Sequence, residues 1–183
     1  MRRERPAIPS AAMLTHFTRS SGAASALDNL LRILDDGVVR GASRMIRGGR
    51  RTVCLFDAPL TELGSLLSEK NRRRYEPFGI AIDKRYAFRM GARPAIYMPW
   101  REARAIINPD DMWRVVGIDL GRNPPLDWSF EREWRLSGDL ALDRRLCVAL
   151  VKSWRDADAV FDHFAGHPPC AGVLPVGELF ESS

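Results

Sequence analysis

The chain has 183 residues, of which 45% are hydrophobic, and it carries a formal net charge of +5 at pH 7. This length and composition predict one globular domain with a buried core. No segment approaches the ~20 consecutive apolar residues that cross a bilayer, and the basic N-terminus is not followed by the apolar stretch of a signal peptide. We therefore expect a cytoplasmic protein with no membrane partner.

The three cysteines, Cys54, Cys147 and Cys170, are widely spaced and form no C-x-x-C pair. This pattern argues against a disulfide framework and against a zinc site, so no metal is expected. The positive charge is compatible with an anionic partner, such as nucleic acid or a phosphate-bearing cofactor. It does not require one, because the codon usage of a GC-rich genome explains the excess of arginine over lysine at least as well.

We expect a flexible N-terminal segment over residues 1–12, followed by a single domain over residues 13–183. A short strand is expected at "MLTHFT". The clearest helix is "SALDNLLRILDDGVV", whose leucines and isoleucine recur at the i, i+3, i+4, i+7 spacing of an amphipathic helix. Gly37 stands where the C-terminal cap of this helix belongs.

The remainder of the chain alternates between short strands and short helices without regular βαβ units. This mixture predicts an α+β domain with antiparallel or mixed sheets. A basic loop, defined here as residues 40–51, precedes the strand "TVCLF". The further strands are expected at residues 79–83, 94–98, 113–120, 131–142, 145–151 and 170–180, and the further helices at 59–75, 84–91, 100–108 and 153–166.

Sequence motifs for the commonest phosphate, dinucleotide and hydrolase sites are missing, since the chain has no P-loop, G-x-G-x-x-G, H-E-x-x-H or G-x-S-x-G. Two groups of polar residues remain as candidates. His16 lies on the predicted first strand among apolar neighbours, where a histidine is more often a hydrogen-bonded structural residue than a ligand.

The second candidate is "EREWR". A strand over this segment would place Glu131, Glu133 and Arg135 on one face. Two carboxylates that share a face repel one another unless a cation, a substrate or a hydrogen bond relieves them. The strand is therefore either part of an active site or a salt-bridged structural element in which Arg135 or Arg132 neutralises the acids.

Residues 13–140 resemble a bacterial family of abortive-infection proteins of the AbiGi kind, through "VCLFDAPL", "FGIAIDK", "GARPAIYM" and "DWSFEREWRL". The segment "LTHFTRSSGAASALDNLLRILDDGVV" also resembles the opening of DarT-type ADP-ribosyltransferases, in which a strand with an H-x-T element leads into a helix of the form "xxNLxxILxxGL". The S-T-S element of the arginine branch of that superfamily is missing from the middle strand.

The resemblance to the transferases implies an ADP-ribosyltransferase-like fold of two sheets with peripheral helices and with NAD bound between the sheets. His16 and Thr18 would bind NAD, and Tyr75 or Phe78 would stack on the nicotinamide. The basic loop, including Arg51, would either hold the pyrophosphate of NAD or the backbone of a nucleic acid acceptor, or be a solvated loop without a ligand. Glu133 would be the catalytic carboxylate that stabilises the oxocarbenium-like transition state. Glu131 would position the acceptor.

Two functions follow from these observations. The first is a toxin or phage-defence enzyme that transfers ADP-ribose from NAD to a nucleic acid or protein. The second is a non-catalytic binding protein or antitoxin partner of a defence pair on the same scaffold, in which the glutamate strand is a salt-bridged structural element. A metal-dependent nuclease is the least favoured, because no D-x-D or comparable spacing of metal ligands is present.

Overall fold

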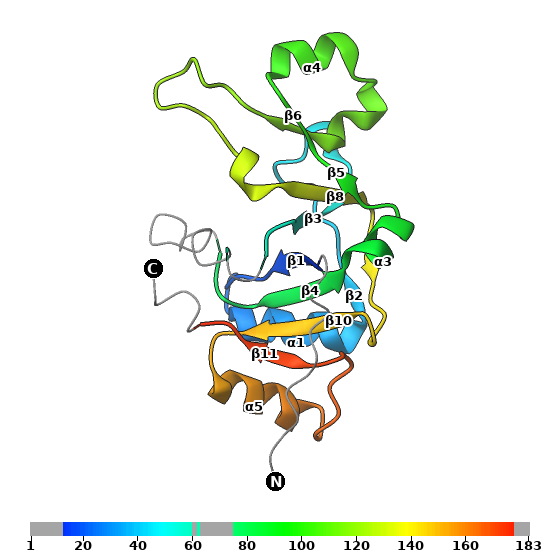
Figure 1. Ribbon diagram of the computed structural model, residues 1–183, viewed down its shortest axis with the longest axis vertical. Coiled ribbons are helices and arrows are strands. Elements are labelled where there is room, and N and C mark those ends of the chain that lie inside the picture. The colour runs from blue at the N-terminus through cyan, green and yellow to red at the C-terminus, as the bar shows by residue number, and fades with distance from the viewer. Residues whose placement is uncertain (1–12, 60–61, 63–74, 178–183) are drawn as a thin grey trace.

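The computed structural model describes residues 13–59, 62 and 75–177 (Figure 1). The predicted flexible segment and nearly all of the helix predicted over residues 59–75 lie outside the described residues. Within the described residues, no helix is long and apolar enough to cross a membrane.

A seven-stranded, mainly antiparallel sheet forms the centre of the protein, with the strand order β11-β10-β4-β1-β3-β8-β5. Among its described strands, only β10 and β11 run parallel to one another. Three strands, Thr52–Phe56, Gly79–Asp83 and Cys147–Val151, are wholly or largely buried because each is rich in apolar residues. The strands are β1 (Met13–Phe17), β3 (Thr52–Phe56), β4 (Gly79–Asp83), β5 (Arg93–Pro94), β8 (Glu133–Ser137), β10 (Cys147–Val151) and β11 (Val173–Pro175).

The sheet is nearly divided between β1 and β3. The described strands pair there at one position, Thr15 opposite Phe56, whereas β1 pairs with β4 along its full length. Beyond Thr15 the two strands part. The sheet therefore consists of two halves, β11-β10-β4-β1 and β3-β8-β5, that share a short seam.

Two helices cover one face of the sheet, α1 (Ala26–Asp36) and α5 (Trp154–His163). Each begins with a capping box, in which Ser25 bonds reciprocally with Asp28 and Ser153 with Asp156. Helix α1 ends at Gly37, whose left-handed φ of 64° is favourable for glycine. The predicted helix and its cap are confirmed.

Alternation along the strands builds two apolar clusters, one on each face of the sheet. The larger cluster, beneath α1 and α5, includes Leu14, Leu55 and Ile80. The smaller one lies on the opposite face and includes Phe56 and Ala81. The side chains of consecutive residues in a strand thus point to opposite faces of the sheet. This alternation assigns a face to each candidate side chain on a strand.

Residues 95–127, which we call the arm, extend from the β5 end of the sheet, away from α5 (Figure 1). The arm pairs β6 (Ile96–Met98) in parallel with β7 (Val115–Gly117) and carries α4 (Trp100–Ile106) and the 3-10 helix η3 (Pro109–Arg114) between them. A second small sheet pairs β2 (Val38–Val39) with β9 (Leu140–Ala141). The short helix α3 (Lys84–Arg89) follows β4.

The predicted α+β class with a mixed, mainly antiparallel sheet is confirmed. The predicted single strand over residues 131–142 is wrong. Glu131 ends the 3-10 helix η4 (Ser129–Glu131), and Arg132 adopts a left-handed φ of 44°, so that β8 begins only at Glu133. The backbone turn between the two glutamates breaks the alternation that would have aligned their side chains.

Candidate functional site: the buried glutamates and the seam of the sheet

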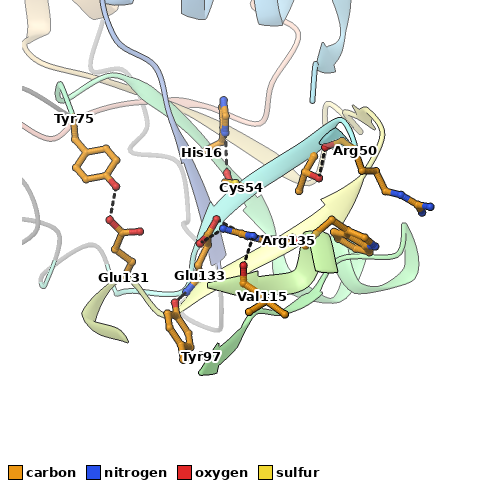
Figure 2. Close-up of polar contacts among 11 residues, drawn as sticks. His16, Arg50, Cys54, Tyr75, Tyr97, Val115, Glu131, Glu133 and Arg135 are labelled. Carbon is orange, nitrogen blue, oxygen red and sulfur yellow. Dashed lines mark hydrogen bonds and ion pairs between the residues drawn. The ribbon is translucent and has the colours of Figure 1, made fainter. Parts of the chain in front are cut away.

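Glu133 and Arg135 form a buried, two-point ion pair on β8. Arg135 Nε lies 3.0 Å from one carboxylate oxygen and Nη2 lies 3.1 Å from the other (Figure 2). Both side chains are less than a tenth exposed. The two residues share a strand face, as the sequence predicts, and the geometry is that of a planar guanidinium bound to a planar carboxylate. This carboxylate is therefore neutralised inside the protein.

Arg135 also holds the arm to the sheet. Its Nη1 donates to the carbonyl oxygens of Trp113 and Val115 at 2.7 and 2.9 Å. Tyr97 adds a second link, because its hydroxyl oxygen accepts a bond of 2.6 Å from the Glu133 amide. Burial, assisted by the nearby Glu133, raises the pKa of Tyr97 to about 12, so its hydroxyl stays protonated at neutral pH.

Glu131 makes a separate interaction. Its carboxylate accepts a hydrogen bond of 2.5 Å from the Tyr75 hydroxyl. The Tyr75 ring packs edge-on against Phe56 and also contacts Phe17, with ring centroids 5.0 and 5.9 Å away. Tyr75, predicted to stack on nicotinamide, is therefore part of an aromatic cluster that fixes the position of a buried carboxylate.

His16 lies at the seam between the two halves of the sheet. Its Nδ1 is 2.9 Å from the carbonyl oxygen of Cys54, a strand carbonyl of β3 that the diverging β1 leaves unpaired (Figure 2). Nδ1 therefore carries the proton and donates it to this carbonyl. Burial lowers the pKa of His16, the bond to Cys54 opposes this shift only in part, and the imidazole is neutral at pH 7.

The two other polar residues of the N-terminal resemblance also bond to backbone carbonyls. The Thr18 hydroxyl donates to the Ala26 carbonyl at 2.8 Å, and Thr18 is buried. Asn29 donates to the Arg19 carbonyl at 2.9 Å. These bonds fix the turn that leads from β1 into α1. The "HxT" and "N" positions thus have a structural role that requires no ligand.

The remaining predicted cofactor residues are also engaged elsewhere. Arg51 forms an ion pair with Asp139 at 2.6 Å and donates to the Gly41 carbonyl. Phe78 is buried in the apolar cluster beneath α1 and α5. The structure brings neither residue to His16 or to Glu133 through a hydrogen bond or ion pair.

His16 and Glu133 belong to opposite faces of the sheet. Glu133 pairs with Phe56, and Phe56 pairs with Thr15, so these three side chains share one face. His16 follows Thr15 in β1, so its side chain lies on the other face of the sheet. Cys54 separates the two candidates: its carbonyl binds His16, whereas its thiol hydrogen-bonds with Glu133. Burial first, and this carboxylate second, raise the pKa of the thiol.

A cavity of about 380 Å³ opens beside His16, at the end of β1 and along α1. Arg19 and Arg32 line it, and so do Arg40 and Asp36, which pair with one another at 3.1 Å. Among the described residues, Asp36 is the only acidic residue of its lining. The cavity could accept an anion, but it contains neither of the two buried glutamates.

Three residues of this region were not singled out from the sequence. Tyr97 and Trp113 lie on the arm, and Cys54 is noted in the sequence only as one of three widely spaced cysteines. Their roles depend on contacts with β8 across long stretches of sequence, for which no local pattern exists. In the described part of the chain, no group of three His, Cys, Asp or Glu side chains is arranged to hold a metal ion.

Comparison of the chain with protein-family models, with curated proteins and with solved structures found no match. The assignment of function therefore depends on the site itself.

Proposed function

We propose that the chain is a non-catalytic binding protein of a bacterial defence system, the binding or antitoxin partner of a toxin. One observation carries the proposal: the side chains assigned to NAD or to catalysis by resemblance already have partners within the protein. Glu133 is bound by Arg135, Glu131 by Tyr75, His16 by Cys54 and Thr18 by Ala26.

The physical reason lies in the cost of separating buried charges. A catalytic glutamate must turn toward developing positive charge, and Glu133 would have to leave Arg135 to do so. Removing one member of a buried ion pair costs about 3–5 kcal/mol, because the remaining charge is left without compensation. This energy favours a permanent structural pair. The family resemblance over residues 13–140 supplies the context of phage defence.

A growth assay tests the proposal. The chain is expressed alone in a bacterial host, and then together with the product of the adjacent gene. Expression alone should leave growth unchanged, and co-expression should relieve an arrest caused by the neighbour. Growth arrest by the chain alone, abolished in a folded Glu133→Gln variant, would reject the proposal in favour of an enzyme.

An NAD-dependent ADP-ribosyltransferase is the second candidate, because His16 lies at a seam between two half-sheets and beside a cavity lined by Arg19 and Arg32. Its test is nicotinamide release from NAD by the purified protein in the presence of DNA, RNA or cell lysate. Release that depends on Glu133 would support the transferase. Release unaffected in Glu133→Gln and in His16→Asn, both checked for folding by circular dichroism, would indicate a contaminant.

A further inference from the structure

The basic loop concentrates positive charge on one part of the surface. Residues 37–56 contain five arginines and no acidic residue. Arg40 and Arg51 are neutralised by ion pairs with Asp36 and Asp139. The other three arginines of the loop are available for an external partner.

Arg44, Arg47 and Arg50 are exposed, and none of them forms an ion pair with another residue in the described part of the chain. Figure 2 shows the Arg50 side chain extending away from the strands. Arginine differs from lysine in presenting a planar fork of donors that binds two oxygens of one phosphate. Three guanidinium groups on one loop, none neutralised by a described carboxylate, therefore favour a ligand with several phosphates.

The loop is held in place at its base and at its centre. Ala42 and Thr52 exchange two backbone hydrogen bonds of 3.0 Å, which close the loop. The Arg47 guanidinium lies 4.8 Å from the centre of the Trp100 ring, the first residue of α4. An anchored loop loses less conformational entropy when it binds a ligand than a free one would.

Helix α4 extends the basic surface. Arg101 and Arg104 are exposed and one helical turn apart, so their side chains project from one side of the helix. Neither forms an ion pair with another described residue. Because Arg47 contacts Trp100, the residue before Arg101, the loop and the start of α4 lie side by side.

Met45, near the tip of the loop, is the second unusual feature. It is 83% exposed, and its φ of 64° lies in the left-handed region, which is unfavourable for a residue other than glycine. An exposed apolar side chain in a costly conformation indicates a functional constraint. Flanked by arginines, a methionine can contact a sugar or insert between bases.

From these observations we propose that the basic loop and α4 form a surface that binds nucleic acid through its phosphate backbone, with Met45 contacting a sugar or base. Binding through phosphates does not depend on sequence and weakens as salt displaces the protein. Helix η3 packs against the loop and carries Asp110 and Asp111. These two carboxylates weaken the binding of nucleic acid, because they repel phosphate.

The test is fluorescence anisotropy with labelled single-stranded DNA, double-stranded DNA and single-stranded RNA of about 20 nucleotides. The full chain should bind at least one of them, and the logarithm of its affinity should fall linearly with the logarithm of salt concentration. The variant R44Q/R47Q/R50Q should lose about tenfold or more in affinity at low salt, and its salt slope should decrease by about 2 to 3.

A matched variant controls for net charge. R85Q/R144Q/R155Q removes the same number of positive charges, from exposed positions outside the basic loop and α4, and should reduce the affinity less than threefold or so. Met45→Ala should lower the affinity without changing the salt slope, because it removes no charge. D110N/D111N should bind more tightly than the wild type.

Three results would overturn the proposal, provided that circular dichroism shows the variants to be folded. The first is the absence of binding to all three nucleic acids at low salt. The second is an equal loss of affinity in both triple variants. The third is displacement of the oligonucleotide by polyglutamate as efficiently as by unlabelled nucleic acid, which would indicate an acidic protein as the partner.

Discussion

At the scale of single residues, the polar side chains of the candidate site act mainly on the protein itself. His16 replaces a missing strand partner by donating to the Cys54 carbonyl, and Thr18 closes the turn before α1. A buried carbonyl without a donor would cost about 1–3 kcal/mol, so the histidine has a physical reason to be there without a ligand. This is the structural role that a strand histidine among apolar neighbours most often has.

The lowered pKa of His16 predicts a specific dependence of stability on pH. The unfolded chain has a histidine pKa of about 6.5 and the folded protein a lower one, so the unfolded state binds more protons between these two values. The contribution of His16 to stability is complete above the unfolded pKa. It is lost as the pH falls from there toward the folded pKa.

The variant His16→Asn retains a donor for the Cys54 carbonyl but does not titrate. Between about pH 7.5 and pH 5.5, the wild type should lose up to about 1.4 kcal/mol more free energy of unfolding than the variant. Urea denaturation at both pH values measures the difference. An identical loss in both proteins would show that His16 does not titrate on unfolding in this range.

At the scale of secondary-structure elements, close packing of an indole on a glycine fixes the arm. A Cβ atom on Gly117 of β7 would lie 2.1 Å from Nε1 of Trp100, so the α4 indole rests directly on the β7 backbone. The Arg47 guanidinium contacts the same ring, 4.8 Å from its centre. Trp100 thereby links α4, β7 and the basic loop.

Gly117→Ala should displace this indole. The new Cβ atom would lie only 2.1 and 2.3 Å from Nε1 and Cε2 of Trp100, and these overlaps can be relieved only if the ring moves. We expect a loss of about 1–3 kcal/mol in the free energy of unfolding, together with a change in tryptophan fluorescence. Gly121→Ala is the matched control, since its Cβ would meet its nearest atom at an ordinary 3.6 Å. Equal effects of the two variants would contradict the packing role of Gly117.

At the scale of the whole molecule, Arg135 couples the arm to the central sheet. One guanidinium binds the Glu133 carboxylate at two points and two carbonyl oxygens of the arm. A lysine keeps the charge, but its single ammonium group cannot reach this set of acceptors in the same plane. The substitution Arg135→Lys should therefore lower the local stability of the arm more than that of the central sheet.

Hydrogen exchange measures this directly. In Arg135→Lys, the amides of β6 and β7 should exchange about tenfold faster or more, whereas those of β4 and β10 should change little. Arg51→Lys, at the exposed pair with Asp139, serves as the control and should leave the arm unaffected. Uniform acceleration across both regions would mean that Arg135 stabilises the entire fold and does not specifically anchor the arm.

Local patterns in the sequence determined much of the fold. Leucine spacing and Gly37 specified α1, and runs of apolar residues specified β1, β3, β4 and β10, because these preferences act between residues close in the chain. The sequence also predicted that Glu133 and Arg135 would share a strand face. It placed Glu131 on the same strand, because the left-handed turn at Arg132 has no strong local signature.

Only the tertiary structure decided which of the candidate residues meet. His16 and Glu133 are 117 residues apart in the sequence. The face of the sheet on which each lies depends on how β1, β3 and β8 pair, and this pairing cannot be predicted from the sequence of any one strand. The two alternatives for "EREWR", active site or salt-bridged strand, differ by the atoms that surround the carboxylate. The buried Arg135, fixed by two carbonyls of a distant arm, supplies those atoms and favours the structural pair.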